Sequence, residues 1–284
     1  MYWEIPMNKT PLIEVNNLCI DFPKARVVNN ISFTLGQERL AIVGESGSGK
    51  SMTARALMGL VRHPGKVSAE ILNLQGNNLL DFSSRQWNNI RGNTISMVLQ
   101  DPRYALNPVK TIYQQVEETV KQHQKLSRQD RRQLIIDTLL SVGLPEQNIY
   151  RYPGELSGGM GQRAMIAIAL INNPTILIAD EPTSALDAQL RHQILELITI
   201  QCEQRNMGLL LISHDLPLVA EYCERVMVMY QGEQVDELDA KALPTASHPY
   251  TRTLWTCRPN ASTYGTQLPV LDRTLNFKGL HHAN

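Results

Sequence analysis

An uninterrupted apolar run followed at once by a glycine-rich octapeptide constrains this chain more than any other feature of its sequence. Residues 40–43 (Leu-Ala-Ile-Val) carry no polar side chain, which is typical of a strand buried on both faces. The octapeptide 44–51 follows. Apolar residues then recur at helical spacing from Ala54 to Val61, and Pro64 ends the predicted helix. A buried strand, a glycine turn and a helix in this order predict a mixed α/β core.

The octapeptide fits the pattern G-x-x-x-x-G-K-[ST] without a mismatch. It consists of Gly44, Glu45, Ser46, Gly47, Ser48, Gly49, Lys50 and Ser51. Glycines let several backbone N–H groups turn toward one phosphate, and the start of the following helix adds a partial positive charge. Lys50 can reach the β and γ phosphates of a nucleotide, and Ser51 can hold Mg²⁺. The sequence therefore predicts a phosphate-binding loop.

Two adjacent carboxylates follow a second apolar run at Ile176–Ala179. Asp180 and Glu181 would lie at the C-terminal end of that strand, the edge where open α/β sheets bind ligands. Asp180 suits the Mg²⁺ shell through water, and Glu181 suits deprotonation of an attacking water. Strands often end in acidic residues, so this pair carries weight only together with the phosphate loop. The combination predicts hydrolysis of a nucleoside triphosphate.

Strand and helix patterns alternate along the rest of the chain, with a helical stretch in the middle. Period-two or continuous apolar runs predict strands at 13–22, 31–35, 67–74, 95–99, 209–212 and 226–230, the last followed by a Gln231-Gly232 turn. Helical spacing predicts helices within 111–142, where Ser127 begins the second helix and Gly143 ends it, and at 161–171 and 190–198. We expect a helical insertion at about 101–158 and an irregular tail beyond about 250.

Composition excludes some classes of protein. Lys plus Arg and Asp plus Glu each number 27, whereas a non-specific nucleic-acid binder normally carries a basic excess, so no nucleic-acid partner is predicted. The longest apolar run, Ala164–Ile171, is far below the roughly 20 residues of a membrane-spanning helix, and no signal peptide is recognised at the start. Four scattered cysteines without a C-x-x-C pair favour reduced structural thiols.

A third motif links the first two to a family. Residues Leu156, Ser157, Gly158, Gly159 and Met160 resemble the LSGGQ-type signature of ABC ATPases, the nucleotide-binding subunits of ATP-binding-cassette transporters. Nearly the whole chain carries the resemblance, with the family's motifs in the family's order. After the phosphate loop come a glutamine loop at Gln100, the signature, Asp180-Glu181, the D-loop Ser184, Ala185, Leu186 and Asp187, and a switch histidine at His214.

The resemblance implies a P-loop NTPase (RecA-like) ABC ATPase core with an inserted α-helical subdomain and an N-terminal antiparallel β portion. It places the ABC ATPase domain at 1–250, with the helical subdomain at about 101–158, and a C-terminal extension at 251–284. Two cassettes pair head to tail in this family. Ser157, Gly158 and Gly159 would then bind the γ-phosphate of the ATP held by the opposite subunit, while Leu156 and Met160 complete the signature.

The resemblance also implies roles for single residues. Gln100 would reach the Mg²⁺ and the attacking water and couple the site to membrane subunits; with Ser51 and Asp180 it would hold the metal. His214 would contact the γ-phosphate. The catalytic residues implied by the resemblance are Glu181, His214, Gln100 and Lys50. Phe22 would stack on adenine, and Met52 extends the ATP-binding set beyond the loop. Asp187 would lie at the seam between the cassettes.

Several segments narrow the resemblance to the ATPases of dipeptide, oligopeptide and nickel importers. They are residues 100–108, Gly159-Met160, residues 180–187 and His248-Pro249-Tyr250-Thr251-Arg252. Gly161 and Gly154 depart from the family, where a larger residue and a histidine are usual. The resemblance implies an ATP-hydrolysing importer subunit on the cytoplasmic side of a bacterial inner membrane. Its partners would be a second ATPase subunit, paralogous or identical, two permease subunits and an extracytoplasmic solute-binding protein.

Three other functions stay open beside this one. A soluble ABC ATPase acting on DNA or ribosomes usually has two fused cassettes or a long coiled-coil insertion, which this chain lacks. A P-loop kinase would explain residues 44–51 but not the signature or His214. An ABC exporter is less favoured by the unfused cassette and the 248–252 segment. The cargo, peptides or nickel and other metal chelates, is not decided.

Overall fold

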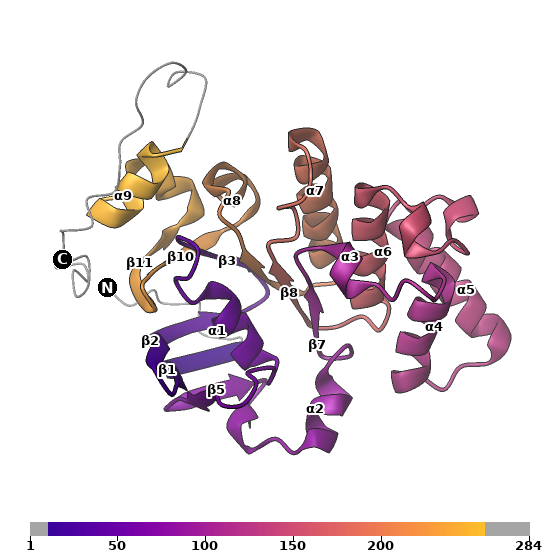
Figure 1. The fold of residues 1–284 in the computed structure, drawn as a ribbon, viewed down its shortest axis with the longest axis horizontal. Coiled ribbons are helices and arrows are strands. Elements are labelled where there is room, and N and C mark those ends of the chain that lie inside the picture. The colour runs from indigo at the N-terminus through magenta and orange to yellow at the C-terminus, as the bar shows by residue number, and fades with distance from the viewer. Residues whose placement is uncertain (1–10, 259–284) are drawn as a thin grey trace. The chain divides into compact units, whose positions relative to one another are not determined.

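The computed structural model describes residues 11–258, which divide into two units. Unit 1 combines residues 11–81 with residues 212–258, and unit 2 is the continuous stretch 82–211. Figure 1 labels most of the helices and strands of both units. We describe each unit by itself.

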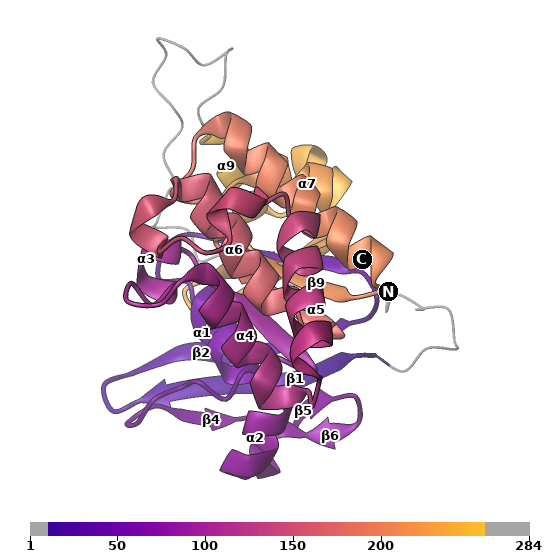
Figure 2. The ribbon, with the colours of Figure 1, turned by 90° about the vertical axis from the view of Figure 1, so that its right-hand side faces the viewer.

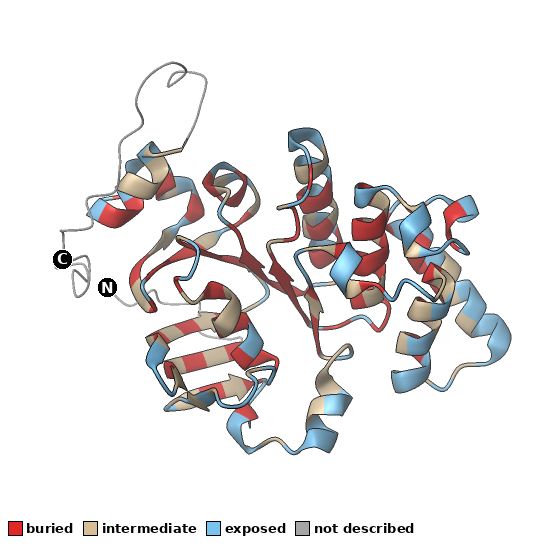
Figure 3. Cartoon of the chain, in the orientation of Figure 1, coloured by how far each residue is buried: buried red, intermediate tan, exposed pale blue. Residues whose placement is uncertain are grey.

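Unit 1 contains an antiparallel sheet near the start of the chain. Its strands follow the order β2-β1-β5-β6, and β4 also pairs with β1. They are β1 (Ile13–Phe22), β2 (Ala25–Leu35), β4 (Lys66–Ser68), β5 (Ile71–Leu74) and β6 (Asn77–Asn78). Buried and half-exposed residues alternate along β2, visible as stripes in Figure 3, because successive side chains point to opposite faces. The predicted N-terminal antiparallel β portion is confirmed.

One strand expected at 67–74 is in fact two, β4 and β5. Both pair with β1, but on either side of Asn17, which has a left-handed backbone with φ of 51°. The register joins Asn16 to Ile71 and Cys19 to Ser68. Because β1 is irregular at this point, no single straight partner can follow its whole length.

The rest of unit 1 is built around β3 (Arg39–Val43). This strand pairs in parallel with β10 (Arg225–Tyr230), which forms a hairpin with β11 (Glu233–Asp239). Four consecutive residues of β3 are fully buried, as the apolar run predicts. Gln231 and Gly232 both have positive φ, the conformation that tight two-residue hairpin turns require, so the predicted turn is confirmed.

Helices of unit 1 differ from the expectation at two places. Its helical elements are α1 (Lys50–Leu57), α8 (Leu216–Tyr222), α9 (Pro249–Thr256) and the 3-10 turns η1 (Leu79–Asp81) and η4 (Ala240–Thr245). α1 ends before Val61, because Gly59 turns left-handed and Leu60 N–H donates to Arg55 O at 2.8 Å, closing the helix end. α9 is a helix where we expected an irregular tail, with Pro249 at its first position. Residues 259–284 of the expected extension lie outside the described residues.

Unit 2 contains three neighbouring strands in the order β9-β8-β7. They are β7 (Ile95–Val98), β8 (Ile176–Asp180) and β9 (Gly208–Ile212), and β7 and β8 run parallel. Every residue of β8 and β9 is buried, and β8 is red in Figure 3. The three strands appear where the apolar runs predict them.

Helices make up every regular element between β7 and β8. They are α3 (Pro102–Ala105), α4 (Ile112–His123), α5 (Arg128–Ser141), α6 (Gly158–Leu170) and the turns η2 (Glu146–Asn148) and η3 (Pro153–Glu155). α4, α5 and α6 pack on one another, as Figure 2 shows. α6 begins at Gly158, three residues before the expected start, because Ser157 caps it. Between residues 101 and 158, every regular element is an α-helix or a 3-10 turn.

Two further helices complete unit 2, α2 (Ser84–Ile90) and α7 (Ala188–Gln204). The sequence did not indicate α2, which buries none of its residues and begins with a reciprocal Ser83–Gln86 capping box. Within residues 11–258, no helix combines the length and the apolar character needed to cross a membrane.

Candidate functional site

Glycines of the phosphate loop adopt backbone conformations that other residues avoid. The loop joins β3 to α1, and φ is 148° at Gly44, 83° at Gly47 and 102° at Gly49. A Cβ atom on Gly44 would lie 2.1 Å from Met229 O, closer than any real contact. The loop therefore turns tightly against β10, and only glycine fits at its first position.

Lys50 reaches back over this loop from the first turn of α1. Its Nζ donates to the carbonyl oxygens of Gly44 and Glu45, each at 2.8 Å, and the side chain is buried. Ser48 is buried in the same loop, and its Oγ has no hydrogen-bond partner among the described residues. Ser51 and Met52 lie half-buried at the start of α1, and the start of a helix attracts anions. A cationic amine, an unpaired hydroxyl and a helix start suit the phosphates of ATP.

The turn between β10 and β11, far from the phosphate loop in the sequence, contacts the loop and supports it. Gly232 N–H donates to Ser48 O at 3.1 Å, and Gly232 O accepts from Asn29 N–H at 2.7 Å. A Cβ atom on Gly232 would lie 2.9 Å from Val27 O. The β10–β11 turn is thus wedged between the phosphate loop and β2, which keeps the shape of the loop.

In unit 2, the two predicted carboxylates lie at the C-terminal end of β8. Asp180 is the last residue of the strand and is buried, whereas Glu181 follows in a left-handed conformation with φ of 47°. The parallel register aligns Val98 with Ala179, and continuing it by two residues brings Gln100 level with Glu181. Gln100 Nε2 donates to Glu181 Oε2 at 3.1 Å. The structure thus joins two residues that were predicted separately.

The signature packs against the D-loop of the same unit. Ser157 Oγ accepts from Met160 N–H at 3.4 Å and so caps α6. Cβ atoms on Gly158 and Gly159 would lie 3.8 Å from Leu186 and 3.4 Å from Leu190, which are ordinary van der Waals distances, so these two side chains lie against the signature. Leu156 precedes the cap, at the end of η3.

Asp187 has a structural contact that the sequence did not suggest. Its carboxylate accepts from Leu190 N–H at 2.9 Å and caps α7. Ser184 and Ala185 lie in the turn before it, where Ser184 N–H donates to Glu181 O at 3.3 Å. An aspartate three residues before an apolar helical pattern is the ordinary signal for such a cap, and it could have been used.

Two predicted residues of unit 1 lie apart from its loop in the sequence. His214 is exposed in the short segment between β9 and α8, where Asp215 N–H donates to Ser213 Oγ at 3.0 Å. Phe22 ends β1 and is half-buried, and a Cβ atom on Gly65 would lie 2.8 Å from its ring. His214 is thus exposed to solvent, whereas the ring of Phe22 packs against the Gly65 backbone.

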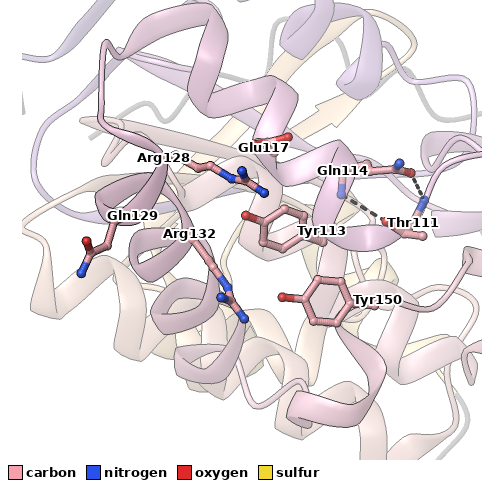
Figure 4. Close-up of a pocket in the computed structure, with 8 residues that line it drawn as sticks. All are labelled: Thr111, Tyr113, Gln114, Glu117, Arg128, Gln129, Arg132 and Tyr150. Carbon is pink, nitrogen blue, oxygen red and sulfur yellow. Dashed lines mark hydrogen bonds between the residues drawn. The ribbon is translucent and has the colours of Figure 1, made fainter.

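A separate pocket lies in unit 2 and contains none of the predicted site residues. Its volume is about 810 Å³, and it is lined by Thr111, Tyr113, Gln114, Glu117, Arg128, Gln129, Arg132 and Tyr150 (Figure 4). The rings of Tyr113 and Tyr150 stack with centroids 5.2 Å apart, and burial raises the pKa of Tyr113. The pocket joins the starts of α4 and α5 to the segment after η2.

Comparison with protein families agrees with the motifs. The sequence model of the family described as ABC transporter matches residues 28–184. The dipeptide transport ATP-binding protein DppD of Escherichia coli (strain K12) is 44% identical over 256 residues, which cover 87% of this chain and 78% of that protein. The oligopeptide transport ATP-binding protein AppD of Bacillus subtilis (strain 168) is 43% identical over 261 residues, with the same two coverages.

A solved structure shares the fold. It is the dimeric post-hydrolysis state of the ATP-binding cassette MJ0796 bound to ADP and Pi. The TM-score is 0.69 at 27% identity, over 80% of this chain and 98% of that one. The P-loop NTPase fold expected from the motifs is confirmed.

Proposed function

Because the chain belongs to the ABC transporter family, we propose that it is the ATP-hydrolysing subunit of an importer for dipeptides or oligopeptides. The observation that carries the proposal is its likeness, over most of its length, to transport subunits named for these two cargoes. The names of both relatives give short peptides as the cargo, which favours peptides over nickel or metal chelates as the cargo of this chain. These names do not favour an exporter or an ATPase that acts on DNA or ribosomes.

The residues of unit 1 suit the binding of the triphosphate. The loop 44–49 offers backbone N–H groups, and Lys50 offers a positive charge that is already held beside the loop. From this place the amine would meet the phosphate oxygens of the triphosphate. His214, exposed after β9, is the proposed contact for the γ-phosphate, and Phe22 is the proposed contact for adenine.

Unit 2 carries the proposed base. Water would attack the γ-phosphorus, the bond to the bridging oxygen of ADP would break, and Glu181 would take the proton of the water. The hydrogen bond from Gln100 holds one carboxylate oxygen of Glu181. Gln100 thereby fixes the direction in which the base faces.

Mg²⁺ is the proposed metal, and the donor set fits it. Ser51, Gln100 and Asp180 offer hydroxyl, amide and carboxylate oxygens, the ligands that hard cations prefer. No group of three or more His, Cys, Asp and Glu side chains suited to a metal occurs between residues 11 and 258. Mg²⁺ is usually held by one or two protein ligands together with phosphate oxygens and water. Bound Mg²⁺ would neutralise charge on the phosphates.

The proposed assembly follows the importer class. A second cassette, identical or paralogous, would supply the signature residues 156–160 to the ATP bound here, and the D-loop 184–187 would face the seam. Two permease subunits would hold the pair at the cytoplasmic side of a bacterial inner membrane, and a solute-binding protein would deliver the peptide. The proposed division remains an ATPase domain at 1–250, with its helical subdomain at 101–158, and an extension at 251–284.

Uptake by cells that lack this chain tests the proposal. Wild-type protein should restore uptake of a radiolabelled dipeptide, and Lys50→Ala should not, because the charge beside the phosphate loop is lost. Lys66→Ala is the matched control, since Lys66 is exposed on β4. If the wild-type protein restored uptake of Ni²⁺ but not of dipeptides, the proposed cargo would be wrong. Full restoration of dipeptide uptake by Lys50→Ala would contradict the ATPase role.

A further inference from the structure

The segment 248–252 marks the importer class in the sequence, yet none of its residues has a part in the chemistry described above. In the structure this segment opens α9 and is fixed at several points. Thr251 Oγ1 donates to Asp236 Oδ2 on β11 at 2.6 Å, and both side chains are buried. Arg252 Nη2 donates to Ser247 O at 2.9 Å. The start of α9 is therefore anchored on β11.

Tyr250 connects the anchored start of α9 to the phosphate loop. Its side chain is completely buried, and its ring lies 4.6 Å from the ring of Tyr230 at the end of β10. Its hydroxyl accepts a hydrogen bond from the backbone N–H of Glu45, with 3.4 Å between nitrogen and oxygen. A buried tyrosine normally finds a partner for its hydroxyl, and here the partner is the backbone of the phosphate loop.

That N–H belongs to the same peptide unit as the carbonyl that Lys50 contacts. A trans peptide is planar, so Gly44 C=O and Glu45 N–H point in opposite directions from one rigid plate. Lys50 Nζ holds the carbonyl end at 2.8 Å, and the Tyr250 hydroxyl holds the N–H end. Two contacts at opposite ends fix the rotation of the plate, which one contact cannot do.

Rotation of this plate matters because the residue before it is glycine. Gly44 has φ of 148° and no Cβ atom, so its own side chain does not restrict the peptide that follows. The loop N–H groups bind phosphate only when they point to a common centre. A contact from outside the loop is therefore needed to keep the arrangement.

We propose that Tyr250 is a positioning residue of the phosphate loop, whose hydroxyl fixes the Gly44–Glu45 peptide and thereby the place of Lys50 for triphosphate binding. The inference rests on the proposed ATP-binding function and extends it to α9, which lies about 200 residues further along the chain. The ring of Tyr250 fills the core of unit 1, and its hydroxyl serves the loop.

Removing only the hydroxyl of Tyr250 tests whether the hydroxyl, rather than the ring, supports the phosphate loop. Tyr250→Phe keeps the ring and should raise the dissociation constants for ATP and for inorganic tripolyphosphate by the same factor. We expect about fivefold, the order that one hydrogen bond contributes. The rate of hydrolysis at saturating ATP should stay unchanged, since Glu181 and Gln100 are not altered, so KM rises while kcat does not.

Tyr230→Phe is the matched control, because this tyrosine shares the ring contact while its hydroxyl accepts from the Gln231 side chain at 2.9 Å. It should bind both ligands as the wild type does. Equal affinities of Tyr250→Phe and wild type would overturn the proposal, as would equal losses in both variants, which indicate ring packing alone. A wild type that binds ATP but supports no uptake would contradict the importer role and leave the comparison of the two variants intact.

Discussion

Gln100 and Glu181 lie 81 positions apart in the sequence and share a hydrogen bond of 3.1 Å from amide to carboxylate. The bond forms because β7 and β8 run parallel and end level with each other, so that the residues after them meet at one edge. A carboxylate fixed by an amide cannot rotate freely. Glu181, the proposed general base, is therefore held in one orientation by Gln100.

Replacing Glu181 by glutamine should remove the base and keep the shape. Glu181→Gln can still accept the hydrogen bond from Gln100 through its amide oxygen, so the loop should not change. We expect ATP hydrolysis to fall by about 10²- to 10⁴-fold, while the affinity for ATP stays within twofold. Glu196→Gln, on the exposed side of α7, is the control and should hydrolyse ATP normally. Hydrolysis by Glu181→Gln at the wild-type rate would show that another group is the base.

Alanine substitutions of three glycines should separate backbone strain from steric conflict. Gly36→Ala should be nearly neutral, since nothing lies within 4 Å of the new Cβ. Gly47→Ala also meets nothing but has φ of 83°, so it should lower the free energy of unfolding by about 1 kcal/mol. Gly44→Ala should cost more than either, because its Cβ would overlap Met229 O. Urea unfolding measures all three, and equal costs at Gly44 and Gly47 would refute the role of this contact.

The cap of α7 predicts a difference between two substitutions of Asp187. Asp187→Ala leaves Leu190 N–H without its acceptor and should lower the free energy of unfolding by about 1 kcal/mol. Asp187→Ser supplies another acceptor and should keep most of the stability. Thermal unfolding of the two variants tests this, and equal melting temperatures would argue against the cap. A loss of ATP hydrolysis in Asp187→Ser at unchanged stability would separately support a place at the seam between cassettes.

Cys223 should make the stability fall at high pH. Burial raises the pKa of its thiol from 9.0 to about 12, so the folded form keeps a proton that the unfolded form releases. The free energy of unfolding should therefore decrease as the pH rises from about 9 toward 12, by up to about 1.4 kcal/mol per pH unit. Cys223→Ala lacks this thiol. The free energy of unfolding of the wild type, relative to that of the variant, should therefore fall by about 1.4 kcal/mol between pH 8.5 and pH 10. Parallel profiles would contradict the raised pKa.

Local sequence patterns were sufficient for much of the fold. Continuous apolar runs located β3, β8 and β9, because strands buried on both faces leave no other pattern. Capping residues and glycines located the ends of the helices within 111–142. These signals lie within one element and its neighbours, so a single sequence shows them.

Features that depend on a distant partner were missed. The division of 67–74 into two strands follows from the left-handed backbone of Asn17 on another strand. α9 was not expected, since its buried Tyr250 and Thr251 pack against residues of β10 and β11. α2 has no buried face, so no apolar period marks it.

The candidate site shows the same limit. Motifs identified Gln100 and Glu181, but only the register of two strands brings them together. Gly161 departs from the family pattern for a reason that the sequence does not show. A Cβ atom there would lie 3.3 Å from two ring atoms of Pro102, so the glycine lets α3 approach α6 closely.

The make-up of unit 1 has a consequence for the order in which the protein matures on the ribosome. Unit 2 is one continuous stretch, whereas unit 1 waits for residues that follow it. The phosphate loop is made early, but the residues that support it, Met229, Gly232 and Tyr250, are made much later. All of unit 2 is synthesised before unit 1 is complete, so the support of the phosphate loop can be assembled only after α9 has been made. The order of synthesis thus separates the phosphate loop from the residues that hold its shape.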